Sequence, residues 1–125
     1  MLAVLDWFLT VLHVAIVLAV VFLWIPRSTW RWHGWLVAVV AFSWLAIGLF
    51  KGAIGYCVLT DLHWRVKRAR GATHLPGSFL KYVADSVTGR DVSPALIDVV
   101  AAMVFAFVCV AAIVRARQTR RRSSP

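Results

Sequence analysis

The chain has 125 residues, of which 62% are hydrophobic and 15% are charged, with a mean hydropathy of +0.80 and a net charge of +9. Soluble domains carry about 25% charged residues, so this composition excludes an ordinary soluble protein and predicts an integral membrane protein of one domain. The basic clusters flank apolar blocks, which favours anionic lipid headgroups as their partner and disfavours nucleic acid. The sequence contains no Glu, which disfavours glycosidase-like and two-metal chemistry.

The first predicted transmembrane helix covers residues 7–25, a 19-residue apolar run that is followed by Pro26. At about 1.5 Å per residue this run reaches about 28 Å, which is close to the thickness of the hydrocarbon core of a bilayer. The second predicted transmembrane helix covers residues 35–52. Its Lys51 is accommodated if the side chain extends along the helix and places the ammonium group at the interface.

The segment that follows carries too many charges to cross the bilayer again. It predicts two short interfacial amphipathic helices, at residues 61–70 and 78–88, each followed by a glycine. Amphipathic helices of this kind lie naturally in the plane of the headgroups. We therefore expect both helices to lie flat against the bilayer.

The third predicted transmembrane helix covers residues 95–114, with Ser93 as its N-cap and Pro94 as its first helical residue. Residues 1–114 then form a single transmembrane helical domain. Residues 115–125 are predicted to be a basic, disordered tail. Because arginines follow this span directly, we expect a cytoplasmic C-terminus and an outward-facing long loop.

Basic side chains beside the apolar segments are expected to contact anionic headgroups. In the first loop helix we expect Leu62, Val66 and Ala69 to form the apolar face, opposite the basic side chains. The predicted headgroup contacts are Arg65, Lys67, Arg68, Arg70, Arg115 and Arg117.

Three motifs together resemble a family of small bacterial integral membrane proteins of unknown function. The motifs are Leu-His at residues 12–13, "GYCVLTDLHW" at residues 55–64 and "LPGSFLKYVAD" at residues 75–85. The resemblance covers most of the chain up to the basic tail. It implies a multi-pass protein of the bacterial inner membrane, and it implies no activity or catalytic residue.

Five ionisable or polar residues within or beside the predicted spans form a candidate intramembrane polar cluster, since such groups mark functional candidates there. Asp6, Thr10 and His13 are spaced i, i+4, i+7 and share one helix face. Lys51 and Asp98 are expected at the same depth as Asp6. Two main interpretations remain, a clamp of Lys51 between the two carboxylates and separate extension of each group to water. A transport or proton-relay role is a third.

His13 is the strongest candidate for a ligand contact. It could ligate haem or another metal, or bond a quinone, with His63 as a second ligand at similar depth. The favoured alternative is a neutral imidazole that bonds Thr10, a backbone carbonyl or a neighbouring helix. His33 is expected at the interface, about 18 Å from His13 along the helix, too far to share one iron.

Two further patterns are interpreted as structural. Cys57, Asp61 and His63 could indicate a metal site or a Cys-His nucleophile, but they supply only two strong ligands, whereas zinc usually takes three or four protein ligands. We therefore predict no metal and a structural turn. Glycines spaced by three or four residues allow helices to approach closely. We therefore predict a helix-packing face formed by Gly48, Gly52 and Gly55.

These features favour a non-enzymatic accessory or structural subunit that packs against a larger membrane complex or against itself. A three-helix bundle has little interior for a site, and no cofactor is predicted. The alternative is a small redox or cofactor protein that uses His13 to bind haem b or quinone. A lipid-headgroup enzyme built on the long loop is a third hypothesis.

Overall fold

The computed structural model describes residues 1–53 and 55–122, and this part of the chain is helical without strands. In chain order the elements are α1 (Leu2–Phe22), the 3-10 helix η1 (Arg27–Thr29), α2 (Trp30–Phe42), the π-helix η2 (Ser43–Ile47), α3 (Gly48–Lys51), α4 (Val58–Ala69), α5 (Phe79–Thr88) and α6 (Pro94–Arg122).

Three of these helical segments are long and apolar enough to cross a membrane, namely Leu2–Phe22, Arg27–Lys51 and Pro94–Arg122. The prediction of an all-α, multi-pass membrane protein with three spans is therefore confirmed. The two amphipathic helices of the long loop are confirmed as α4 and α5, each displaced by up to three residues from its predicted limits.

The basic tail differs from the prediction, because α6 continues as helix as far as Arg122. Arg, Ala and Gln are strong helix formers, and basic side chains stabilise the negative end of the helix dipole. Thr119 Oγ1 also donates to the carbonyl oxygen of Arg115 (3.0 Å). The expectation of disorder is thus wrong for residues 115–122, and the rest of the tail lies outside the described residues.

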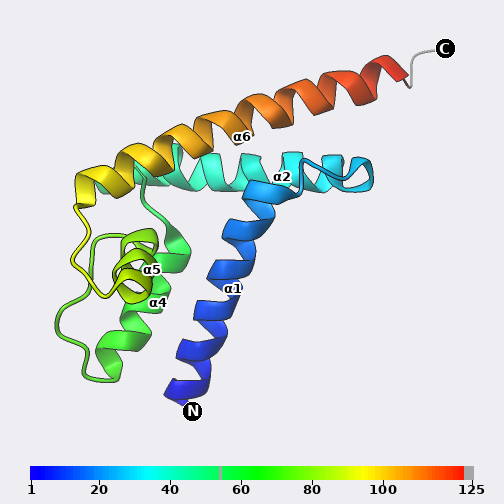
Figure 1. The fold of residues 1–125 in the computed structure, drawn as a ribbon. Helices are drawn as coiled ribbons and strands as arrows, with labels where there is room; N and C mark the ends of the chain where they lie inside the picture. Colours follow the sequence, from blue (N-terminus) through cyan, green and yellow to red (C-terminus); the bar gives the residue numbers. More distant parts are fainter. Residues whose placement is uncertain (54, 123–125) are drawn as a thin grey trace.

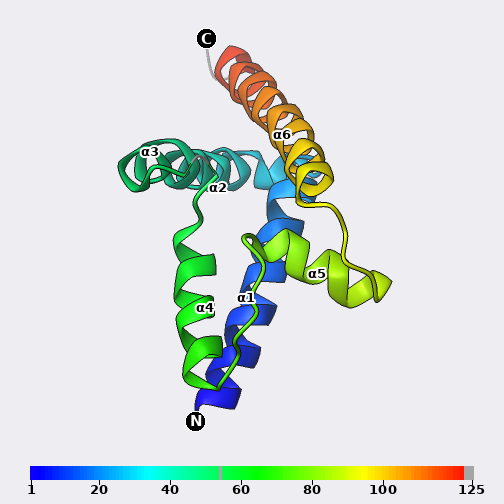
Figure 2. The same ribbon diagram turned by 90° about the vertical axis from the view of Figure 1, so that its left-hand side faces the viewer.

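The helices form two pairs rather than one bundle (Figure 1). Helices α2 and α6 lie side by side. Helix α1 meets them only near its C-terminal end, and the rest of α1 runs beside α4. The view turned by 90° shows the same divergence, with α5 between α1 and the start of α6 (Figure 2). This arrangement replaces the expected three-helix bundle and leaves interior space between the two pairs.

The apolar core lies where α1, α2 and α6 meet. Val20, Val37 and Val108 are buried there, with Val108 fully enclosed. His33 is also fully buried, and its Nε2 donates to the carbonyl oxygen of Val20 (2.9 Å). Its side chain therefore fastens α2 to the last turns of α1. The position of His33 at the membrane interface stays a prediction.

The connection between α5 and α6 is held by Lys81, which the sequence did not single out. Lys81 Nζ donates to Asp85 Oδ2 (2.8 Å), to the carbonyl oxygen of Val92 (2.7 Å) and to Asp91 Oδ1. The hydrogen bonds to Asp85 and Asp91 raise the pKa of Lys81, and the bonds from Lys81 and the Val92 backbone N–H lower the pKa of Asp85. One lysine thus organises the turn that leads into the third span.

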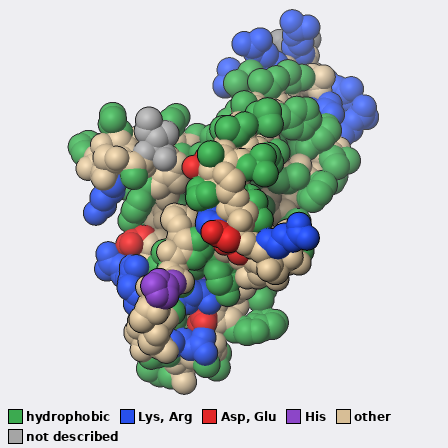
Figure 3. All heavy atoms as spheres, turned by 60° about the vertical axis from the view of Figure 1, so that its left-hand side comes forward, with side chains coloured by type: hydrophobic (Ala, Val, Ile, Leu, Met, Phe, Trp, Pro, Cys, Tyr) green, Lys and Arg blue, Asp and Glu red, His purple; other side chains and the backbone are tan. Residues whose placement is uncertain are grey.

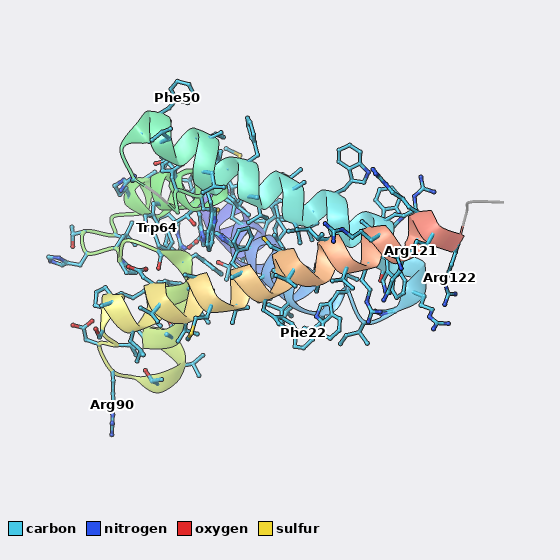
Figure 4. All side chains as sticks on the ribbon, turned by 90° about the horizontal axis from the view of Figure 1, so that it is seen from above. Phe22, Phe50, Trp64, Arg90, Arg121 and Arg122 are labelled. Atoms are coloured by element: carbon cyan, nitrogen blue, oxygen red, sulfur yellow. The ribbon has the colours of Figure 1, made fainter. Side chains whose placement is uncertain are left out.

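Charge is distributed unevenly over the surface. In Figure 3 hydrophobic side chains cover the α6 side of the molecule, and Lys and Arg gather at its C-terminal end. Lys, Arg and Asp mix on the opposite side, over α4 and α5. Seen from above, Arg121 and Arg122 lie at the end of the molecule opposite Phe50 and Arg90 (Figure 4).

Candidate functional site

Asp6 forms the centre of a buried charge cluster between α1 and α4. Only 5% of its surface is exposed. His63 Nε2 donates to Asp6 Oδ1 (2.7 Å), Lys67 Nζ lies 3.0 Å from the same oxygen, and Arg70 Nη1 pairs with Oδ2. A buried carboxylate is stable only when it is paired and hydrogen-bonded, and the three partners on α4 meet this requirement.

The spacing on α4 explains how three partners reach one carboxylate. His63, Lys67 and Arg70 stand at i, i+4 and i+7, so they share one face of the helix. Thr10, one turn after Asp6, lies 3.3 Å from His63 Nε2, and its hydroxyl donates to the Asp6 carbonyl oxygen (2.9 Å). The Asp6 cluster, defined as Asp6, Thr10, His63, Lys67 and Arg70, therefore joins two helix faces.

Lys67 also extends the cluster to α5. Its Nζ donates to the Tyr82 hydroxyl (3.2 Å) and lies 4.6 Å from the centre of the Tyr82 ring. Burial alone lowers the pKa of Lys67, but its hydrogen bonds to Asp6 and Tyr82 outweigh this effect and leave the pKa above its ordinary value. The ammonium group stays protonated and links three helices.

The predicted faces of the first loop helix are correct only in part, because Val66 is buried as expected but its predicted neighbours are not. Leu62, assigned to the apolar face, is half exposed, whereas His63 is fully buried. Lys67 and Arg70, expected at the headgroups, turn toward Asp6 instead. Arg65 pairs with Asp61 (3.0 Å) on the other side of α4, and Arg68 remains exposed. An unpaired carboxylate in α1 was the signal that could have directed the basic face inward.

The predicted polar cluster is assembled only in part. The structure brings Asp6 and Thr10 together with His63, but Lys51 and Asp98 are exposed and form no ion pair with any residue between 1 and 53 or 55 and 122. The proposed clamp by Lys51 is therefore wrong. Its place is taken by cations of α4, because the divergence of α1 moves Asp6 away from α3 and α6.

His13 lies two turns further along α1 and is buried, with 6% of its surface exposed. Its ring stacks on Phe79 of α5, with centroids 3.8 Å apart and planes 6° from parallel. Its Nε2 lies 3.8 Å from Cys57 Sγ, and its Nδ1 has no hydrogen-bond partner among the described residues. Cys57 thus meets His13 rather than His63.

His13 and His63 do not suit one haem as axial ligands. Phe79 covers a face of the His13 ring, and its own ring centre lies 5.9 Å from that of His63. His63 Nε2 is already bonded to Asp6. Nε2 of His63 is thus used by Asp6 and Nε2 of His13 faces Cys57 Sγ, whereas Nδ1 of each ring has no hydrogen-bond partner among the described residues.

The three glycines predicted to form a packing face behave differently from one another. Gly48 is buried, but Gly52 and Gly55 lie beyond the end of α3 with φ angles of +68° and +87°. A Cβ added at either position would meet nothing within 4 Å. Within the chain, Gly52 and Gly55 serve the turn that leads to α4 and do not form a packing face.

A cavity of about 700 Å³ lies in the space between the two helix pairs. Its walls are mainly apolar and come from α1, α5, α6 and the end of α2, with His13, Cys57 and Thr60 among the polar contributions. Ligand pockets commonly have volumes of about 300–1,000 Å³ and a few convergent polar groups. This cavity was not expected from the sequence, because the expected bundle had no such interior.

Comparisons with known proteins agree with the predicted resemblance. The family model described as "Protein of Unknown function (DUF2784)" matches residues 3–116. No curated protein and no solved structure matches the chain. The matched range runs from α1 into the arginine-rich part of α6 and includes both the Asp6 cluster and the cavity.

Proposed function

Because the chain belongs to the family described as "Protein of Unknown function (DUF2784)", whose description assigns no activity, we propose a function from geometry. The protein acts as a small, non-enzymatic accessory subunit that packs beside a larger membrane complex or a second copy of itself. It resides in the bacterial inner membrane, with a cytoplasmic C-terminus.

The Asp6 cluster is the observation that supports this proposal. An ionisable residue inside a span is by default a candidate for transport or catalysis. Here the Asp6 carboxylate receives His63, Lys67 and Arg70, so its bonding capacity is used to fasten α4 to α1. The Asp6 carboxylate, the strongest candidate for chemistry in the spans, is thus used for helix packing. This use favours a packing role for the whole protein.

The distribution of exposed groups supports the choice of partners. Large apolar side chains on α2 and α6 point outward, including Phe42 at 64% exposure and Met103 at 61%. The exposed Arg68 and Arg117 suit anionic headgroups. Arg31 of α2 and Arg120 of α6 line the same surface hollow, so basic side chains of the first loop and of the end of α6 share one end of the molecule. This distribution favours a cytoplasmic location for that end.

Photocrosslinking in living cells tests the proposal. A photoreactive phenylalanine analogue is placed at Phe42, and the matched control is the same analogue at Phe105, which packs on Trp44 with ring centres 4.7 Å apart. We expect one discrete crosslinked band from Phe42, containing either a second copy or one other membrane protein, and none from Phe105. Crosslinks to lipid alone, together with a monomer in mild detergent, would refute the accessory role.

A further inference from the structure

The surface hollow lined by Arg31 and Arg120 is an open groove of about 770 Å³ between α2 and α6. The end of α6 lies beside the start of α2, since Cζ of Arg115 stands 4.4 Å from the centre of the Trp30 ring. Arg31 and Arg120 therefore mark one end of the groove, which is its basic end. We name this hollow the α2–α6 groove, and its lining includes Arg31, Gly34, Ala38, Cys109, Ala112 and Arg120.

Small side chains leave the α2–α6 groove open beyond its basic end. Gly34 and Ala38 line it from α2, and Ala112 and Ala116 line it from α6. A Cβ added at Gly34 would meet nothing within 4 Å. Apolar surface that packs against nothing forfeits dispersion contacts, so a flexible apolar chain of the bilayer would gain contacts by filling this space.

The length of the groove matches one leaflet of a bilayer. Its first and last lining residues on α6 are Cys109 and Arg120, which stand about 16 Å apart along the helix axis at about 1.5 Å per residue. Half of a hydrocarbon core is about 15 Å thick. A phosphate bonded at the basic end would therefore bring an attached acyl chain along the whole groove.

The charge at the basic end selects an anionic head. The sequence contains neither Asp nor Glu between residues 7 and 60 or between residues 99 and 125, so the side-chain charge of α2 and of the last turns of α6 is positive throughout. Beside α1, in contrast, Lys67 and Arg70 are paired with the Asp6 carboxylate. A guanidinium has five N–H donors and can bond two phosphate oxygens at once. Basic pockets between membrane helices are typical sites for phospholipid headgroups.

We propose that the α2–α6 groove binds one anionic phospholipid, whose phosphate is bonded by Arg31 and Arg120 and whose acyl chain lies along Gly34 and Ala112. Trp30 also lines the groove, and tryptophan prefers the membrane interface, where the phosphate lies. A zwitterionic lipid would add a cationic group to an end that is already cationic. This inference goes beyond the accessory role, does not depend on it, and holds for either orientation in the membrane.

The test is native mass spectrometry of the full chain in a mild non-ionic detergent, titrated with dioleoyl phosphatidylglycerol. Dioleoyl phosphatidylcholine, which has the same chains and a zwitterionic head, is the comparison lipid. The charge variant combines Arg31→Gln with Arg120→Gln. Its matched control combines Arg27→Gln with Arg122→Gln, which removes the same charge from exposed positions outside the groove lining. Melting temperatures verify that each variant is folded.

We expect one phosphatidylglycerol to bind the wild type saturably and more tightly than phosphatidylcholine. The dissociation constant for phosphatidylglycerol should rise about tenfold in the charge variant, the equivalent of one charge-assisted hydrogen bond, and less than about twofold in its control. Equal affinities for the two lipids would overturn the proposal. An equal loss in the charge variant and its control would also overturn it, because the net charge alone would then explain binding.

A second variant tests the position of the acyl chain independently of the arginines. Gly34→Leu fills the groove within α2, where Gly34 has open space and no left-handed backbone, and Ala102→Leu on the exposed surface of α6 is its control. Gly34→Leu should lose the bound phosphatidylglycerol, and Ala102→Leu should retain it. Unchanged binding in folded Gly34→Leu would contradict the proposal.

Two other occupants are separated by the same spectra. Glycerophosphoglycerol, the headgroup without its chains, should leave no bound adduct, and binding as tight as that of the whole lipid would contradict a role for the groove. A dimer without bound lipid that is lost in Gly34→Leu would also refute the proposal, because a second copy would then fill the groove.

Discussion

Asp6 and His63 stand 57 positions apart, yet Nε2 of His63 lies 2.7 Å from Oδ1 of Asp6. Their contact fixes α4 along the first half of α1 and determines which face of α4 points inward. Lys67 and Arg70 follow on that face and complete the pairing of the carboxylate. A single acidic residue in the first span therefore organises most of the long loop.

Substitution of Asp6 by Asn should destabilise the protein. It leaves Lys67 and Arg70 without their anionic partner, and the loss of one member of a buried pair costs about 3–5 kcal/mol. The melting temperature in mild detergent should fall clearly. The matched control is Asp98→Asn, which changes an exposed residue of α6 and should leave the melting temperature unchanged. Equal effects of the two variants would favour a role for Asp98 that the structure does not provide.

Two glycine substitutions should shift stability in opposite directions. Gly34 lies inside α2 with open space around its Cβ position, so Gly34→Ala should stabilise the helix by about 1 kcal/mol. Gly52 adopts a left-handed conformation after α3, so Gly52→Ala should cost about 1–2 kcal/mol. Thermal unfolding in detergent measures both. A stabilising Gly52→Ala would show that Gly52 does not adopt the left-handed conformation after α3.

The turn before α6 should lose order in acid. Hydrogen bonds from Lys81 and Val92 hold the pKa of Asp85 below its ordinary value of 3.8. A lowered pKa contributes stability that is complete above about 3.8 and is lost as the pH falls through the lower folded value. The protection factor of the Val92 amide against hydrogen exchange, relative to the intrinsic rate at each pH, should therefore stay high down to about pH 4 and fall below it. In Asp85→Asn the exchange should be fast across this range, and an unchanged rate would contradict the assignment.

The same lysine predicts a limit at high pH. The pKa of Lys81 is raised above 10.5 by Asp85 and Asp91, so its contribution is complete below 10.5 and disappears as the pH rises through the folded value. Protection of the turn should thus persist through the neutral range. The variant Lys81→Met should lose this protection at every pH, whereas Arg90→Met, at an exposed position nearby, serves as the control.

The purified protein should show no Soret band. Phe79 covers one face of the His13 ring, and Nε2 of His63 is bonded to Asp6, so haem ligation by both rings would require these contacts to change. Visible absorption and iron analysis of the wild type and of His13→Gln provide the measurement. Near-stoichiometric haem in the wild type that disappears from the variant would require a rearrangement of α5 away from α1.

The spans and the two loop helices were predictable because each is encoded in a continuous segment of the chain. Apolar runs of sufficient length predict spans, and the 3.6-residue period predicts α4 and α5. Ser78, the first residue of the predicted range 78–88, is the N-cap of α5, where its Oγ accepts from the Lys81 backbone N–H (3.2 Å). These features depend on residues that are close together in the sequence, so a sequence pattern can predict them.

The contacts within the site were not predictable in the same way. A basic amphipathic helix suits a headgroup layer and a buried carboxylate equally well, and the choice for α4 depends on Asp6, which lies far away in sequence. Gly52 ends α3 in a left-handed conformation, and where α3 ends cannot be read from the spacing of the glycines. The cavity arises from the divergence of α1, which is a tertiary property of several helices together.

The π-helix at Ser43–Ile47 makes the chain sensitive to its length at this point. One extra residue in a helical turn rotates everything that follows by about 100° around the helix axis. Trp44 meets Phe105 of α6 within this turn, and Ser43 Oγ donates to the Tyr56 carbonyl oxygen (3.2 Å). Deletion of one residue here would restore an ordinary α-helix. The segment that leads from α3 to α4 would then leave the helix on a different side. The gene should therefore tolerate many substitutions in this turn and no one-residue deletion.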